Sequence, residues 1–61
     1  MYLPNNPVIL LSLVNNQLRD NYADLNSFCE ENDCSKNEIC MPLTRLGYSY
    51  DPEINQFKLS D

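Results

Sequence analysis

The 61-residue sequence predicts a mostly α-helical domain with a small β-hairpin. We expect three helices followed by a C-terminal two-stranded hairpin, arranged like a winged helix-turn-helix. Three observations predict this fold class. An apolar stripe repeats at helical spacing through residues 7–20, a capping box begins at Ser35, and tyrosines alternate after Gly47, the single glycine. Residues 1–61 are treated as one small domain.

The first helix is expected over residues 7–20, with Asn6 as its N-cap and Pro7 at its first position. At about 100° per residue, the apolar residues 10, 11, 14, 18 and 22 fall on one stripe, which is the predicted core face. Ile9 and Leu13 fall on a different side, where a helix that covers one core does not need them. Two alternatives follow: the hairpin packs over Ile9 and Leu13, or a second chain does.

The second helix is expected over residues 25–32, after the N-cap Asp24. Its apolar residues Leu25, Phe28 and Cys29 are predicted to point inward. In the general helix-turn-helix pattern, Cys29 occupies the position where a small residue lets the two helices touch. The position of the usual turn glycine is occupied by Asp33, which departs from the pattern.

The third helix is expected over residues 36–46, opened by the capping box of Ser35 and Glu38 and ended by Gly47. Pro42 falls inside this segment, where proline removes one backbone hydrogen bond and clashes with the preceding turn. We therefore expect a kink near Pro42, or a helix that stops at Met41 and restarts as a looser turn.

The hairpin is expected over residues 48–59, because two tyrosines alternate on its first strand and Phe57 and Leu59 alternate on its second. The segment 51–53 has proline at its second position and fits a type I turn. Asn55 follows, and asparagine tolerates the left-handed conformation that such a connection needs.

Size and composition limit the ways in which this domain is stabilised. A chain this short buries only about 60% of the surface that its unfolded form exposes, so disulfides, a metal or a partner subunit usually contribute. The three cysteines are odd in number, and the N-terminal residues carry no secretory signal, which favours a cytoplasmic protein with reduced thiols. A partner subunit therefore remains as a contribution to the stability of the domain. A membrane span is not expected.

A metal site is not predicted, because the sequence contains no histidine and no CxxC pair. A site built from Cys29, Cys34 and Cys40 and completed by Asp33 is the alternative, but these cysteines are five and six residues apart and lack the close pairs typical of structural zinc sites. Catalysis has equally little support, since a cysteine nucleophile needs a base or a cation beside it. Cys40, placed on the surface with Lys36 one turn earlier, is the single candidate, and we expect no enzyme, cofactor or small-molecule ligand.

DNA binding through the third helix is the alternative function that the fold class raises. Lys36 and Asn37 lie where a recognition helix contacts base edges. The chain, however, carries a net charge of -5, and its four basic residues are scattered. Binding through phosphates requires clustered basic residues, so nucleic acid is an unlikely partner. Carboxylates are close to the two candidate residues in the sequence: Glu30, Glu31, Asp33 and Glu38.

A polar patch ends the first helix, formed by Asn15, Asn16, Arg19 and Asp20. One interpretation is a docking site for polar groups of a partner. The other, which we favour, is that Arg19 and an asparagine tie the hairpin or the second helix to the first helix, because a small core gains from such ties.

The sequence also resembles a family of short bacterial proteins known only as a domain of unknown function. The resemblance rests on PVILLSLVNNQLRDNY (residues 7–22), on Leu25 and Cys29, on LGYSYD (46–51) and on NQF (55–57). It covers nearly the whole chain and implies a complete, independently folding protein. It implies no activity, substrate or cofactor. Cys34 and Pro42 depart from the pattern of this family.

The predicted function is therefore a small acidic cytoplasmic protein-interaction module. Self-association through the first helix, with Ile9 and Leu13 as anchors, is the expected mechanism, and a homodimer is the expected partner state. Its driving force is burial of apolar surface. DNA binding through Lys36 and Asn37 remains the alternative.

Overall fold

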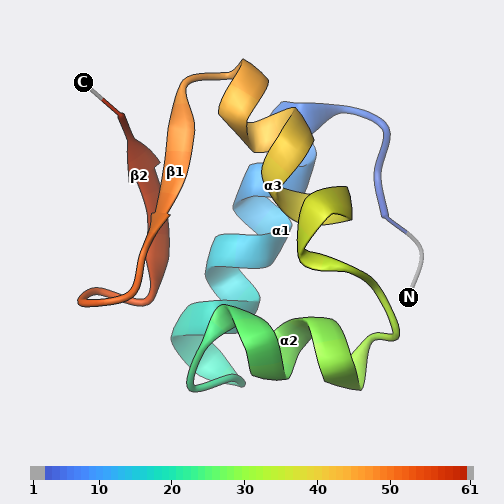
Figure 1. Ribbon diagram of the computed structural model, residues 1–61, viewed down its shortest axis with the longest axis vertical. Helices are drawn as coiled ribbons and strands as arrows, with labels where there is room; N and C mark the ends of the chain where they lie inside the picture. The colour runs from blue at the N-terminus through green and yellow to red at the C-terminus, as the bar shows by residue number, and fades with distance from the viewer. Residues whose placement is uncertain (1–2, 61) are drawn as a thin grey trace.

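The computed structural model describes residues 3–60 and contains three helices and one hairpin (Figure 1). The predicted fold class is confirmed. The second and third helices each end one residue earlier than expected. In order, the elements are α1 (Pro7–Asp20), α2 (Leu25–Glu31), α3 (Lys36–Arg45), β1 (Tyr48–Asp51) and β2 (Gln56–Leu59).

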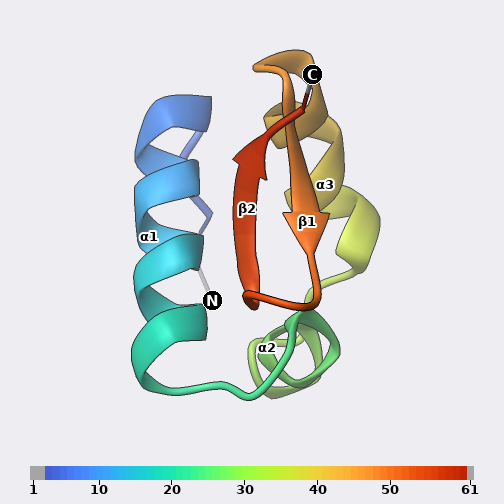
Figure 2. The ribbon, with the colours of Figure 1, turned by 90° about the vertical axis from the view of Figure 1, so that its left-hand side faces the viewer.

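The hairpin packs on one side of the first and third helices, which also contact each other (Figure 1 and Figure 2). Strand β2 runs beside α1, strand β1 contacts α3, and α2 closes one end of the molecule. The two strands are antiparallel, with Tyr48 opposite Leu59 and Asp51 opposite Gln56. This arrangement turns the outer edge of β2 toward α1, so α1 takes the place of a third strand.

Both ends of α1 depart from a simple helix in ways that matter for the site. At the start, the side chain of Asn6 accepts a 2.9 Å hydrogen bond from the Val8 N–H, and Pro7 occupies the first position, as predicted. At the end, the Tyr22 N–H bonds the Gln17 carbonyl at 3.1 Å. The Leu18 carbonyl, which would receive this N–H in a continuing helix, is left for another donor.

The turn between α2 and α3 is built from two capping motifs. Asp33 has a φ of 53°, the left-handed conformation that the usual glycine of a helix-turn-helix supplies. The Cys34 N–H bonds the Cys29 carbonyl at 3.0 Å, and the Asp33 N–H bonds the Glu30 carbonyl at 3.4 Å, which is the Schellman pattern. The predicted capping box of Ser35 and Glu38 then begins α3.

Helix α3 runs unbroken from Lys36 to Arg45 through Pro42. The alternative that the helix stops at Met41 and restarts is therefore wrong. Tertiary packing explains the continuity, because Ile39 and Leu43, on either side of the proline, are completely buried. The kink near Pro42 stays a prediction.

The core is assembled from one face of every helix and one residue of the hairpin. Phe28 lies at its centre and packs edge-on against Tyr22, with ring centroids 5.4 Å apart. Phe57 closes the core from β2 and contacts Tyr50, with centroids 5.5 Å apart. The buried residues are Leu10, Val14, Leu18, Leu25, Phe28, Cys29, Ile39, Leu43 and Phe57.

Candidate functional site

The outer face of α1 presents apolar side chains to solvent. Ile9 is 57% exposed and Val8 is 61% exposed, and Leu13 is half-buried one turn after Ile9. The partly buried residues that pack against the core include Leu11 but not Leu13. The hairpin is attached to α1 at Asn15, which at helical spacing lies well away from Ile9 and Leu13. The alternative that the hairpin covers Ile9 is therefore wrong.

Asn15 joins α1 to the edge of β2 through a two-point contact. Its side-chain oxygen accepts a 2.7 Å hydrogen bond from the Phe57 N–H, and its side-chain nitrogen donates a 3.0 Å bond to the Phe57 carbonyl. The amide thus pairs with Phe57 as a neighbouring strand would. It leaves the outward N–H and C=O of Phe57 satisfied although both are partly buried.

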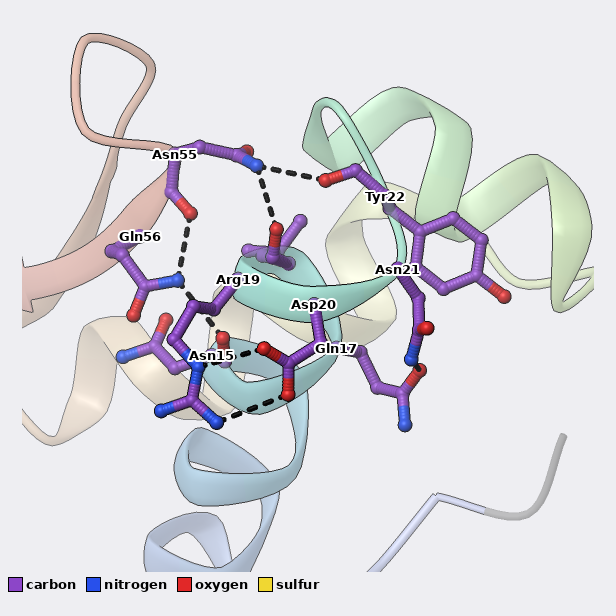
Figure 3. A network of polar contacts seen from close by, with 9 residues as sticks. Asn15, Gln17, Arg19, Asp20, Asn21, Tyr22, Asn55 and Gln56 are labelled. Carbon is purple, nitrogen blue, oxygen red and sulfur yellow. Dashed lines mark hydrogen bonds and ion pairs between the residues drawn. The ribbon is translucent and has the colours of Figure 1, made fainter.

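Asn55 and Gln56 continue this contact toward the end of α1 (Figure 3). The Asn55 side chain donates two 2.9 Å bonds, to the carbonyls of Leu18 and Tyr22. Asn55 therefore caps the C-terminus of α1 from 37 residues away. Gln56 donates a 2.9 Å bond to the carbonyl of Asn15.

Tyr50 connects the same network to α2. Its hydroxyl donates a 2.6 Å bond to the side-chain oxygen of Asn55 and accepts a 3.3 Å bond from the Leu25 N–H. The φ of 53° at Asn55 turns this residue back toward α1, as the tolerance of asparagine for this conformation allows. We call the contacts made by Asn15, Tyr50, Asn55 and Gln56 the amide seam.

The amide seam decides between the two interpretations of the polar patch. Asn15 does tie the hairpin to α1, as favoured. The same role for Arg19 is wrong, because Arg19 is exposed and pairs with the adjacent Asp20 at 2.9 Å. This ion pair lowers the pKa of Asp20, chiefly through the hydrogen bond from Arg19. Figure 3 shows the pair near Asn15 and Gln56, with the two hydrogen bonds of Arg19 both directed to Asp20.

The two candidate DNA contacts, Lys36 and Asn37, are both exposed in the first turn of α3. They line an open depression between α2 and α3. Three carboxylates line the same depression: Glu30, Asp33 and Glu38. Negative charge therefore surrounds the surface on which a phosphate would have to lie.

The three thiols differ in burial. Cys29 is buried, and burial is the main reason why its pKa is raised to about 11. Cys40 was expected on the surface, but it is only partly exposed and packs against the core, as does Cys34. Burial raises the pKa of Cys40 and outweighs the lowering effect of Lys36. This environment disfavours the thiolate that a nucleophile requires.

Within residues 3–60, no three side chains of the ligating types come together to hold a metal ion. None of the helices in this part of the chain is long and apolar enough to cross a membrane.

Sequence reasoning missed the most connected residues of the site. Asn55 was predicted only to adopt a turn conformation, and Gln56 was given no role. Their partners are 33 to 41 residues away in the chain, so no local pattern indicates them. The signal that pointed to them was the family resemblance, since NQF is one of the segments on which it rests.

Comparison with known proteins agrees with that resemblance. No curated protein and no solved structure matches the chain. A family model described as "Domain of unknown function (DUF4250)" matches residues 4–57, which include all five elements up to Phe57. The chain therefore belongs to the DUF4250 family.

Proposed function

We propose that this protein is a small cytoplasmic interaction module that forms a homodimer through the outer face of α1. Ile9 and Leu13 are the anchors of the contact. The observation that carries the proposal is the exposure of Ile9, at 57%, on a helix whose core face and hairpin side are already occupied. Its mechanism is burial of apolar surface and involves no catalysis.

The distribution of charge supports contact through this helix. Residues 7–18 contain no charged side chain, whereas the whole chain has a net charge of -5. The first charges on α1 are Arg19 and Asp20, which pair with each other. Two copies packed through the first three turns of α1 therefore keep most carboxylates apart and in water.

The size of the apolar face implies weak association. Burying a side chain of this kind contributes about 1.5–3 kcal/mol at most, and Ile9 and Leu13 are partly shielded already. Association itself opposes this by an estimated 4–15 kcal/mol. We expect a dissociation constant on the order of 10 µM or weaker, so that the dimer forms only at high concentration.

The test is the solution mass, measured by sedimentation equilibrium over a wide range of concentration. We expect the native chain to approach the dimer mass and Ile9→Asp to remain a folded monomer. Ile54→Asp is the matched control, because Ile54 is 55% exposed on the turn between β1 and β2. A native chain that is monomeric at every concentration, or equal loss of dimer in both variants, would refute the proposal.

Leu13→Asp distinguishes an interface from the core. Leu13 is half-buried, so its variant requires a check of folding by circular dichroism. A folded monomer supports the interface. An unfolded Leu13→Asp together with a monomeric native chain assigns this side chain to the core and removes it from the proposal.

DNA binding is the second candidate, and the exposure of Lys36 and Asn37 in the first turn of α3 favours it. The carboxylates of Glu30, Asp33 and Glu38 in the same depression oppose it. This function would be established if the native chain is retained on duplex DNA, if retention falls steeply with salt, and if Lys36→Glu is not retained. Absence of retention at low salt would exclude it.

A further inference from the structure

Cys29 and Cys34 flank the C-terminal turn of α2. Cys29 is the third residue from the end of the helix, and Cys34 is the second residue after the cap. The Cys34 N–H bonds the Cys29 carbonyl at 3.0 Å, which closes the Schellman pattern around Asp33. In this motif, the side chains at these two positions commonly contact each other. The fold thus holds two thiols side by side at a turn fixed by backbone hydrogen bonds.

The two thiols share one surface but differ in access. Both line the open depression between α2 and α3, where Cys34 is partly exposed and Cys29 is 5% exposed. After burial, the nearby Cys34 is the next cause of the raised pKa of Cys29, which agrees with their proximity. Cys34 is therefore the thiol that a reagent from solution meets first.

We propose that Cys29 and Cys34 are a modification site that forms a reversible intramolecular disulfide with a low-molecular-weight disulfide. The Cys34 thiolate attacks one sulfur of the reagent and releases one small thiol, leaving a mixed disulfide on Cys34. Cys29 then loses its proton and attacks the Cys34 sulfur, which releases the second small thiol. In sum, two protein thiols are oxidised, and one small disulfide is reduced to two thiols.

We expect the new bond to require little movement of the backbone, because the hydrogen bond from the Cys34 N–H to the Cys29 carbonyl already brings the two residues together. It closes a loop of six residues and constrains the unfolded chain. For a domain of this size, we expect the thermal midpoint of the oxidised protein to rise by about 5–10 °C. The site is independent of the proposed dimer, since it lies on α2 and the following turn and not on α1.

The charge of the depression selects the reagent for the test. Glu30, Asp33 and Glu38 line it, so a cationic disulfide is attracted and an anionic one is repelled. Cystamine, buffered by its reduced form cysteamine, is the probe. The dilute native chain is equilibrated over a series of cystamine to cysteamine ratios, quenched with acid and analysed by mass spectrometry, in buffer and in concentrated urea.

We expect the native chain to lose two hydrogen atoms in mass without adding cysteamine, with Cys29 and Cys34 linked in the peptide map. The effective concentration of one thiol with respect to the other, within the same chain, should be at least about tenfold higher in buffer than in urea. Cys40→Ser is the matched control and should behave like the native chain. Cys34→Ser should give no internal disulfide, and Cys34→Ala serves if the serine variant fails to fold.

Three results would overturn the proposal. The first is an internal disulfide in Cys34→Ser, which would link Cys29 to Cys40. The second is a native chain that stops at the mixed disulfide on Cys34. The third is an internal disulfide that forms no more readily in buffer than in urea, because the fold would then contribute nothing.

Discussion

Two sides of α1 differ in the kind of side chain that they present. One side bonds the hairpin through amide groups, and the other exposes apolar side chains to solvent. On the hairpin side, Asn15 pairs with both backbone groups of Phe57, and Asn55 caps the end of the helix. On the outer side, Ile9 exposes 57% of its surface and is not among the described residues that pack against the core. Beside its apolar core face, the helix therefore has a polar side that bonds the hairpin and an apolar side that faces solvent.

The amide seam has its polarity for a physical reason. The edge of β2 presents backbone groups that need partners, and apolar side chains cannot provide them. An amide carries a donor and an acceptor on one planar group and so can replace a neighbouring strand. The outer face has no such groups to satisfy, and another surface that covered its apolar side chains would remove them from water.

The largest expected effect comes from breaking the seam at Asn15. Asn15→Ala leaves the partly buried N–H and C=O of Phe57 without partners, and we expect a loss of about 2–3 kcal/mol in the free energy of unfolding. Thermal and urea unfolding measure it. Asn16→Ala, at the adjacent exposed position, is the control and should lose less than about 0.5 kcal/mol. Equal losses in the two variants would show that the seam does not stabilise the fold.

A smaller effect is expected at Tyr50, which links the seam to α2. Tyr50→Phe keeps the ring contact with Phe57 but removes the bond to Asn55 and the acceptor for the Leu25 N–H. We expect a loss of about 1–2 kcal/mol in the free energy of unfolding. The double variant with Asn15→Ala sharpens the comparison. A combined loss well below the sum of the single losses indicates one cooperative network, whereas simple additivity contradicts it.

The smallest expected effect is on the pH dependence of stability. This dependence comes from charged groups outside the amide seam, because the seam itself is neutral. Asp24 caps α2, and the hydrogen bond from the Ser27 backbone is the main cause that lowers its pKa from the ordinary 3.8. The Asp51 pKa is also lowered, chiefly by the hydrogen bond from Lys58. A carboxyl with a lowered pKa in the folded state stabilises that state above its unfolded pKa and loses this contribution as the pH falls through the folded pKa.

We therefore expect the thermal midpoint of the native chain to be nearly constant above about pH 5 and to fall below about pH 4. Asp24→Asn retains a capping side chain and should show a shallower fall. Asn15→Ala should show the same fall as the native chain, because the seam contains no titrating group among Asn15, Asn55 and Gln56. An acid dependence confined to the seam variant would contradict this separation.

How much the sequence predicted depended on the distance over which each interaction acts. The helix starts at Pro7 and Lys36 were found because each cap satisfies backbone groups two or three residues away. The stop at Gly47 and the left-handed Asn55 were found because they depend on one residue's own conformational freedom. Asp33 was counted as a departure, although it adopts the conformation of the glycine it replaces.

The predictions that failed concern contacts between distant segments. Arg19 was expected to hold the hairpin but pairs with its neighbour Asp20. Cys40 was expected on the surface but is only partly exposed because it packs against the core, and α3 continues through Pro42 because buried residues on both sides hold it. In each case local chemistry permitted several outcomes.

By itself, the sequence determined the three helices, the hairpin, the core stripe of α1 and the family to which the chain belongs. These features follow from periodicity and capping, which act within a few residues. Only the tertiary structure decided that the edge of β2 lies against Asn15, that Asn55 caps α1, and that Cys29 and Cys34 share one depression with three carboxylates. Those contacts depend on how the elements pack, because each joins groups whose nearness is set by the whole fold.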